Sequence, residues 1–147
     1  ITDKNMTRFN ISLKDGCEMV FYAIEKAWGG EVFVPKIPSY KILDVATAIA
    51  PNMEQKLVGI RPGEKLHEEM ITSSDSYNTV DLGNYYAILP QKSPYSSYSK
   101  EDYKKVYNAT DVPKDFSYDS GNNTKWETVE SLRELVKLHV DSNFDVE

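Results

Sequence analysis

The sequence predicts a small mixed α/β fold with about four helices and short strands. Segments with apolar residues at helical spacing alternate with short apolar runs that are closed by Gly or Pro. The chain has 147 residues, of which 40% are hydrophobic, so it can bury one modest core. We therefore expect a single domain over residues 1–147.

The first part of the chain is expected to contain an extended segment, a helix and a strand. Residues 1–9 favour an extended backbone, and the following apolar residues recur at helical spacing from Ser12 onward. Gly29 and Gly30 end this helix because glycine stabilises a helix poorly. Residues 31–34 then form a short β-branched and aromatic run, which predicts a strand.

The middle of the chain predicts a second helix, a strand and a third, brief helix. Residues 42–49 carry an apolar helical face that ends before Pro51. The run Leu57 to Ile60 favours a buried strand, because it is apolar and is followed by Pro and Gly. Leu66 to Ile71 is expected to be a short helix.

The last part of the chain predicts a hairpin, an irregular segment and a final helix. Residues 79–81 and 86–89 favour strands on either side of a Gly-Asn pair. Residues 91–111 are rich in Tyr, Ser and Lys, and we expect a surface excursion there. Thr128 is a suitable N-cap for an amphipathic helix that reaches Val140, and residues 141–147 are expected to fray.

The charged stretch IRPGEKLHE at residues 60–68 is the most promising site for chemistry. Arg61 carries a planar fork of donors that suits a phosphate or carboxylate. Only three of the seventeen basic residues are arginines, so lysine supplies positive charge wherever geometry is indifferent. The alternative is that Arg61 pairs with Glu64 or Glu68 as ordinary surface charge.

Three motifs together indicate a family. RPGEKLHEEMI at residues 61–71, MTRF at 6–9 and GGEVFVP at 29–35 resemble the C-terminal part of the configuration-inverting UDP-N-acetylglucosamine 4,6-dehydratases. These are extended short-chain dehydrogenases of polysaccharide and nonulosonate biosynthesis. The resemblance runs over about residues 1–90 and 112–136. It implies that this chain is the substrate-binding part and that the N-terminal Rossmann domain is absent.

The resemblance also assigns roles to four residues of a UDP-sugar site. It implies that Arg8 and Arg61 hold the diphosphate, that Glu64 accepts hydrogen bonds from the uridine ribose, and that Asn10 supplies a neighbouring contact. Without the resemblance, Arg8 could cap an acidic helix face and Glu64 could pair with a nearby lysine.

The implied parent enzyme oxidises C4 of UDP-N-acetylglucosamine, eliminates water across C5 and C6, and inverts C5. Its NADP would be bound by the Rossmann domain, since this chain has no Gly-x-Gly-x-x-Gly after a strand. We therefore expect no catalytic residue, no cofactor and no activity in these 147 residues alone. A nucleotide-sugar epimerase or reductase, or a non-catalytic binding module, remains the alternative.

One apparent catalytic motif is rejected. Tyr22 and Lys26 satisfy Tyr-x-x-x-Lys, the spacing at which short-chain dehydrogenases place a proton-transferring phenol beside an ammonium group. In that family the pair lies upstream of the segment that MTRF resembles. We therefore expect a structural role for both residues.

Composition excludes several other classes. A net charge of −6 argues against a nucleic-acid-binding surface. Cys17 is the single cysteine, which suits a cytoplasmic location, and His67 and His139 are too far apart to predict a metal site. No apolar run is long enough to cross a membrane. The expected partners are a UDP-sugar, the Rossmann domain of the same protein and, in the complete protein, further copies in a homo-oligomer.

Overall fold

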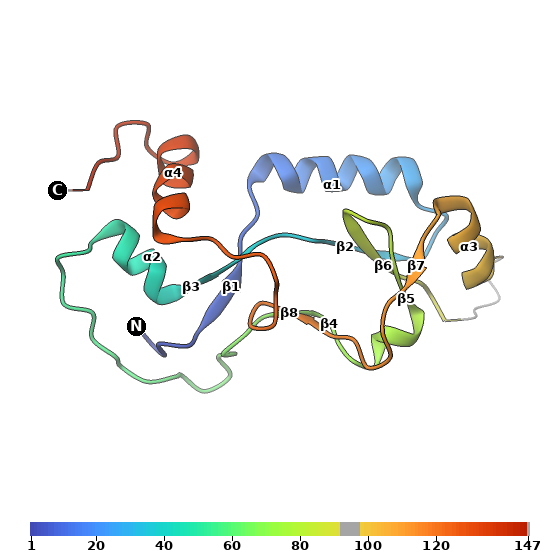
Figure 1. Cartoon of the computed structure of the whole chain (residues 1–147), viewed down its shortest axis with the longest axis horizontal. Coiled ribbons are helices and arrows are strands. Elements are labelled where there is room, and N and C mark those ends of the chain that lie inside the picture. The colour runs from blue at the N-terminus through green and yellow to red at the C-terminus, as the bar shows by residue number, and fades with distance from the viewer. Residues whose placement is uncertain (92–97, 147) are drawn as a thin grey trace. The chain divides into compact units, whose positions relative to one another are not determined.

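The computed structural model describes residues 1–91 and 98–146, and over these it confirms a mixed α/β fold with four α-helices and short strands (Figure 1). The chain divides into two compact units, each with its own internal contacts. Unit 1 comprises residues 1–12, 37–68 and 119–147. Unit 2 comprises residues 13–36 and 69–118.

Unit 1 is built from two short strands and two helices. Strands β1 (Thr7–Phe9) and β3 (Ser39–Lys41) pair antiparallel, with Arg8 opposite Tyr40. Helix α2 (Ile42–Ile49) follows β3 directly and packs against α4 (Val129–His139). The predicted bounds of α2 are confirmed.

Helix α4 begins as its sequence predicts. The Ser131 N–H donates to Thr128 Oγ1 at 3.2 Å, and the Thr128 N–H donates to Ser131 Oγ at 2.8 Å. This reciprocal capping box satisfies backbone donors that the first turn of a helix leaves without partners. In the same helix, Arg133 Nε donates to the Ala48 carbonyl of α2 at 3.2 Å, which ties the two helices together.

Unit 2 contains a four-stranded antiparallel sheet in the order β2-β6-β5-β7. The predicted hairpin is confirmed, because β5 pairs with β6 in a register that sets Val80 opposite Ala87. Strand β2 is an edge strand of this sheet, and α1 packs against it. The elements of this unit are α1 (Leu13–Lys26), β2 (Val32–Pro35), β4 (Glu69–Ile71), η1 (Asp75–Asn78), β5 (Thr79–Asp81), β6 (Tyr85–Ile88), α3 (Lys100–Tyr107) and β7 (Thr110–Asp111). Strand β8 (Tyr118–Asp119) includes the last residue of unit 2 and the next residue, which belongs to unit 1.

The core of unit 2 includes residues of the segment expected to be a surface excursion. Within residues 91–111, positions 92–97 lie outside the described residues, and most of the remainder forms α3 and β7. Tyr103 of α3 is fully buried and joins a core cluster with Val80, Ala87, Leu89 and Ala109. The sequence did not predict this role, because the helix is short and most of its residues are charged.

Two predicted elements in the middle of the chain are wrong. Residues 57–60 form no strand, although the Val58 N–H donates to the Ile1 carbonyl at 2.8 Å. A strand needs a ladder of such bonds, and no ladder continues along this run among the described residues. The helix expected over residues 66–71 is replaced by an irregular segment and strand β4. Because residues 57–60 form no strand, Arg61 does not follow one.

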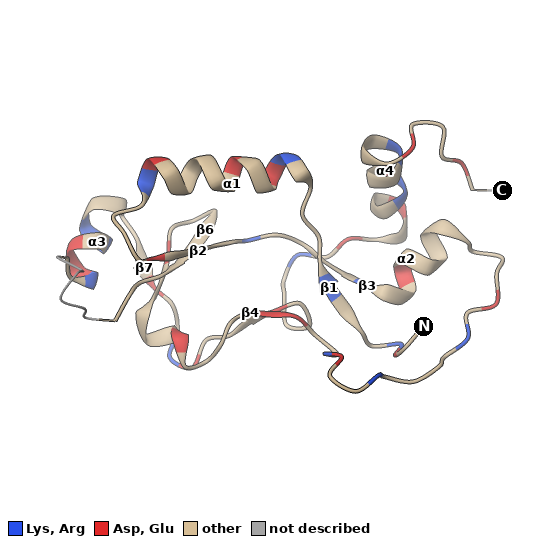
Figure 2. Cartoon of the chain, turned by 180° about the vertical axis from the view of Figure 1, so that it is seen from behind, with Lys and Arg blue, Asp and Glu red and all other residues tan. Residues whose placement is uncertain are grey.

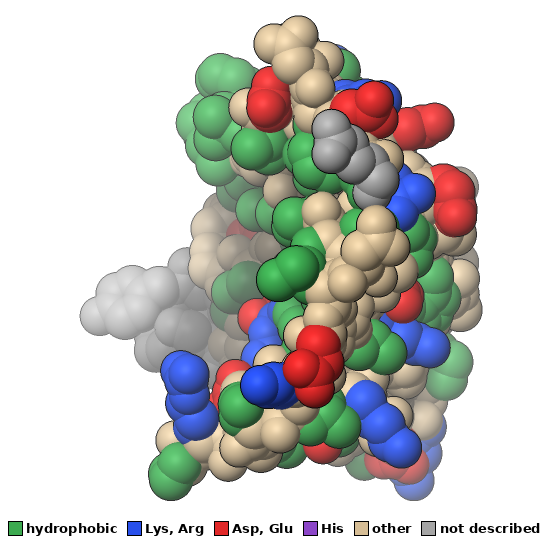
Figure 3. All heavy atoms as spheres, turned by 90° about the vertical axis from the view of Figure 1, so that its left-hand side faces the viewer, with side chains coloured by type: hydrophobic (Ala, Val, Ile, Leu, Met, Phe, Trp, Pro, Cys, Tyr) green, Lys and Arg blue, Asp and Glu red, His purple; other side chains and the backbone are tan. Residues whose placement is uncertain are grey.

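Hydrophobic side chains also remain at the surface. No residue of α1 is buried, and Leu13, Phe21 and Ile24 are 86%, 70% and 75% exposed. These three residues lie at helical spacing and share one face, opposite Tyr22, which packs on Tyr85 and Phe33 of the same unit. The face drawn in Figure 3 also shows hydrophobic side chains, which lie between scattered charged groups.

Two tyrosines of the unit 2 core give a matched test of buried hydroxyl groups. The Tyr103 hydroxyl is buried without a hydrogen-bond partner among the described residues, whereas the Tyr107 hydroxyl donates to the Lys26 carbonyl at 2.6 Å. Tyr103→Phe should raise the free energy of unfolding by about 1 kcal/mol, because it removes an unsatisfied polar group. Tyr107→Phe should lower it by about 1 kcal/mol. Urea unfolding of both variants checks the prediction, and a loss of stability in Tyr103→Phe would contradict it.

Candidate functional site

The charged loop of residues 60–68 lies alongside the N-terminal segment in unit 1. The Thr7 N–H donates to the Leu66 carbonyl at 3.1 Å, which joins β1 to the end of the loop. Pro62 and Gly63 turn the loop, and the Glu64 N–H closes the turn on the Arg61 carbonyl at 3.0 Å. Gly63 has φ of +81°, a conformation that favours glycine. All four predicted site residues therefore belong to the same compact unit.

Arg8 is held in place by several groups. Its Nη1 donates to the Thr7 carbonyl at 2.6 Å and to the Leu66 carbonyl at 3.3 Å. Its Nε lies 3.5 Å from Glu68 Oε1, so the guanidinium forms an ion pair with the end of the charged loop. Arg8 therefore does not cap a helix, and it presents a fixed rather than a mobile positive charge.

Glu64 approaches Arg8 through two intervening groups. Arg8 Nη2 lies 3.3 Å from the sulfur of Met6, and the Thr2 hydroxyl lies 3.3 Å from that sulfur. The same hydroxyl lies 3.3 Å from Glu64 Oε1. One sulfur and one hydroxyl thus separate the Arg8 guanidinium from the Glu64 carboxylate, and the structure brings these two predicted site residues together.

Arg61 keeps its guanidinium available. Its backbone N–H donates to Glu64 Oε2 at 3.1 Å, so the main chain, not the side chain, meets the carboxylate. Among residues 1–91 and 98–146, no hydrogen bond or ion pair engages the guanidinium. The alternative that Arg61 pairs with Glu64 or Glu68 is not observed there, and Glu68 pairs with Arg8 instead.

Asn10 is directed elsewhere. Its Nδ2 donates to Glu127 Oε1 at 3.2 Å, just before α4, and its backbone N–H donates to the Pro38 carbonyl at 2.8 Å. Among the described residues, no hydrogen bond or ion pair links Asn10 to Arg61 or Glu64. Contacts therefore link Arg8 to Glu64 and the Arg61 backbone to Glu64, whereas Asn10 contacts Glu127 and Pro38.

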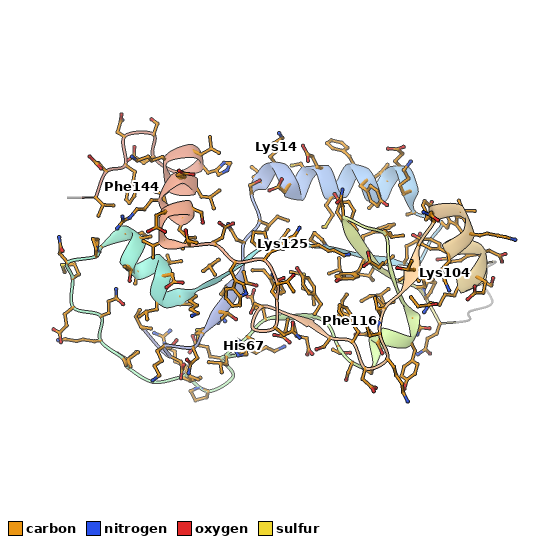
Figure 4. The ribbon with its side chains drawn as sticks, viewed as in Figure 1. Lys14, His67, Lys104, Phe116, Lys125 and Phe144 are labelled. Carbon is orange, nitrogen blue, oxygen red and sulfur yellow. The ribbon has the colours of Figure 1, made fainter. Side chains whose placement is uncertain are left out.

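Sequence reasoning missed a buried hydrogen-bonded group next to this site. Thr7 Oγ1 lies 2.8 Å from His67 Nδ1 and 2.6 Å from Ser120 Oγ. Figure 4 shows His67 on the segment that passes beside β1. Ser120 is 113 residues from Thr7 in the chain, so no local pattern signals the contact.

Tyr40 senses the charges around Arg8. Burial raises the pKa of the Tyr40 phenol, the Glu68 carboxylate raises this pKa further, and the Arg8 guanidinium opposes both effects. Tyr40 lies opposite Arg8 in the β1–β3 pair. Its titration therefore reports on the Arg8–Glu68 ion pair.

The rejected Tyr-x-x-x-Lys motif has the surroundings of a packed aromatic residue. The Tyr22 ring stacks on Tyr85 at 4.4 Å and meets Phe33 edge-on at 5.4 Å. Burial is the main cause that raises the Tyr22 pKa, whereas proton transfer in short-chain dehydrogenases needs a lowered one. Lys26 forms an ion pair with Glu25.

Charge is mixed along the whole chain, and Figure 2 shows acidic and basic groups interspersed on the helices. The described residues contain no group of three or more side chains able to hold a metal ion. Among the same residues, no helix combines the length and apolar character needed to cross a membrane.

Comparisons with known proteins show which family the chain resembles. A family model described as "Polysaccharide biosynthesis protein" matches residues 1–90. A UDP-N-acetylglucosamine 4,6-dehydratase (inverting) from Campylobacter jejuni subsp. jejuni serotype O:2 is 48% identical over 141 residues, covering 92% of this chain and 41% of that protein. A UDP-glucose 4-epimerase from Rickettsia bellii is 35% identical over 147 residues, covering 96% of this chain and 41% of that protein.

A solved structure shares the fold. The X-ray structure of Pen from Bacillus thuringiensis matches with a TM-score of 0.71 and 26% identity, covering 92% of this chain and 40% of that one. The chain spans about 41% of the length of the curated relatives that it matches. The compared proteins are therefore much longer than the sequence described here.

Replacing Glu68 tests the charge balance at Arg8. Glu68→Gln keeps an oxygen beside the Phe9 N–H, 3.4 Å away, but removes the negative charge 3.5 Å from Arg8. The Tyr40 pKa should fall, because the Glu68 carboxylate is one of the causes that raise it. NMR titration of Tyr40 measures the change. Glu69→Gln is the control, and an unchanged Tyr40 pKa in Glu68→Gln would contradict the prediction.

Proposed function

Because the chain belongs to the polysaccharide biosynthesis protein family, we propose that it supplies the UDP-sugar-binding residues of a UDP-N-acetylglucosamine 4,6-dehydratase. The contact line from Arg8 through Met6 and Thr2 to Glu64 is the observation that carries this proposal. In this line one sulfur and one hydroxyl group separate the Arg8 cation from the Glu64 carboxylate. Arg61, whose backbone N–H donates to Glu64, begins the same turn.

The three side chains suit the two ends of a nucleoside diphosphate. Arg61 offers a planar fork of N–H donors to phosphate oxygens, and Arg8 adds a second positive charge. Glu64 is acceptor-only when ionised, so it suits the ribose hydroxyls, which donate hydrogen bonds. Asn10 remains a proposed neighbouring contact, although its amide is directed toward Glu127.

Such a grip would act on catalysis through position. Holding the UDP end fixes where the hexose lies, and binding energy from the remote part of a substrate can be used at the reacting carbon. In this proposal Arg8, Arg61 and Glu64 bind and orient the substrate, and none of them moves a proton in the reaction. The chain by itself is proposed to be inactive.

The reacting partner is proposed to be an N-terminal Rossmann domain of the same protein. Strand β2 is a sheet edge with Val32 57% exposed, and α1 presents Leu13, Phe21 and Ile24 to solvent. Apolar surfaces of this kind are typical of an interface. A nicotinamide cofactor such as NADP would belong to that domain, because this chain offers no Gly-x-Gly-x-x-Gly turn to hold one. A cytoplasmic location and a homo-oligomer complete the proposal.

The reaction is tested with the complete protein and UDP-N-acetylglucosamine. A 4,6-dehydratase gives a product that has lost one molecule of water, which mass spectrometry detects. An epimerase, the activity in the name of the Rickettsia relatives, gives a product of unchanged mass. An unchanged mass with an altered sugar configuration would replace the dehydratase by the epimerase. No conversion with retained UDP binding would favour a binding module.

Exchanging arginine for lysine at two positions separates binding from stability. Arg61→Lys keeps the charge but loses the fork, and it should weaken UDP binding about tenfold with little change in melting temperature. Arg133→Lys, the matched control, should lower the melting temperature and leave UDP affinity unchanged, because Arg133 donates to the Ala48 carbonyl. Calorimetry and thermal denaturation measure both. Equal UDP affinity in wild type and Arg61→Lys would remove Arg61 from the site.

A further inference from the structure

Three buried or partly buried side chains link the candidate site to distant parts of unit 1. Thr7 Oγ1 lies 2.8 Å from His67 Nδ1 and 2.6 Å from Ser120 Oγ. The Glu68 N–H donates to Ser120 Oγ at 2.9 Å, and the Ser120 N–H donates to the Glu68 carbonyl at 2.7 Å. Thr7 is 3% exposed and Ser120 is fully buried, so water does not readily replace these bonds.

The available donors and acceptors determine the direction of the hydrogen bonds between Ser120, Thr7 and His67. Ser120 Oγ already accepts the Glu68 N–H, and Thr7 Oγ1 is the acceptor within reach of its own hydrogen. If Ser120 donates to Thr7, then Thr7 donates to His67 Nδ1 and both hydroxyl hydrogens are used. The reverse direction leaves the buried Ser120 hydrogen without an acceptor among the described residues, which is unfavourable. The favoured direction places the His67 proton on Nε2.

These hydrogen bonds connect the loop that carries Arg61 and Glu64 to the strand that carries Arg8. His67 and Glu68 end the loop that carries Arg61 and Glu64, and Thr7 directly precedes Arg8. The Leu66 carbonyl accepts both the Thr7 N–H and Arg8 Nη1, so a shift of His67 would move the groups that hold Arg8.

Gly121 provides the space for the His67 ring. A Cβ atom built at Gly121 would lie 2.7 Å from His67 Cγ and Nδ1, closer than real Cβ contacts. Gly121 does not have a positive φ, so an alanine there would strain the ring contact rather than the backbone. Gly16, in contrast, has nothing within 4 Å of such an atom and also lacks a positive φ.

We infer that His67, Thr7 and Ser120 are positioning residues, which hold the Arg61–Glu64 loop against β1 so that a UDP-sugar meets Arg8, Arg61 and Glu64 together. Gly121 contributes to the same arrangement, because the absence of a side chain there leaves room for the His67 ring. The inference rests on the proposed function and extends it to residues that do not touch the ligand.

The test uses the complete protein and four new variants, with Tyr107→Phe and Arg61→Lys for comparison. Gly121→Ala pushes on the ring, and Gly16→Ala is its matched control. His67→Leu removes the acceptor for the Thr7 hydroxyl, whereas His67→Asn retains an oxygen near the position of Nδ1. UDP affinity, the KM and kcat for UDP-N-acetylglucosamine, and the melting temperature are measured for each. Nitrogen-15 NMR of the wild type determines which His67 nitrogen carries the proton.

The expected result is weaker binding without slower chemistry. Gly121→Ala and His67→Leu should weaken UDP binding about tenfold and raise KM, with kcat nearly unchanged. His67→Asn should retain most of the affinity, Gly16→Ala all of it, and NMR should show the proton on Nε2. Tyr107→Phe, which loses a hydrogen bond in unit 2, controls for a general loss of stability.

Two results separate the possible failures. If Arg61→Lys weakens UDP binding but Gly121→Ala and His67→Leu weaken it no more than Tyr107→Phe, the positioning role is wrong and the proposed function stands. If the wild type binds no UDP, the proposed function is wrong and the positioning role is withdrawn with it. A proton on Nδ1 of His67 would overturn the assigned direction of the hydrogen-bond chain.

Discussion

Unit 1 depends on the need to satisfy buried hydroxyl groups. Its fully buried apolar side chains are few among the described residues, whereas Thr7, Ser39 and Ser120 are buried and polar. A buried hydroxyl without a partner is costly, so each one must find donors and acceptors on other segments. Ser39 Oγ accepts Asn123 Nδ2 at 2.9 Å, and Ser120 joins Thr7 and Glu68. Two of these bonds hold the end of the charged loop, because Ser120 exchanges hydrogen bonds with Glu68.

The three arginines show what a guanidinium fork does in this protein. Arg8 and Arg133 each direct donors at backbone carbonyls, at Leu66 in one case and Ala48 in the other. Both serve the fold, and Arg8 still places a positive charge beside the Glu64 line of contacts. Arg61 alone has no such bond to its guanidinium within the described residues. An arginine in this sequence therefore indicates a position that needs directed N–H donors. Such a position can serve the fold as well as a ligand site.

Unit 2 is organised differently, around aromatic packing. Tyr103 lies 4.6 Å from Tyr107 and 5.1 Å from Trp28, ring centre to ring centre, beneath the β-sheet core. Large aromatic rings bury much apolar surface for little loss of side-chain freedom. Helix α1, which belongs to this unit, packs one face on β2 and leaves Leu13, Phe21 and Ile24 exposed on another, so part of the apolar surface of the unit is not covered. That surplus is the physical basis for proposing a further domain as its partner.

The sequence by itself determined the elements that local interactions stabilise and the motifs that identify the family. Helices α2 and α4 and the β5–β6 hairpin follow from apolar spacing, a capping box and a Gly-Asn turn, all within a few residues of one another. The motifs around Arg8, Arg61 and Glu64 also lie within short stretches. Only the tertiary structure decided that residues 57–60 are not a strand, that Tyr103 is a core residue, and that His67 and Ser120 meet at Thr7. Pairing of strands and satisfaction of buried hydroxyls depend on partners far away in the chain, which local spacing does not encode.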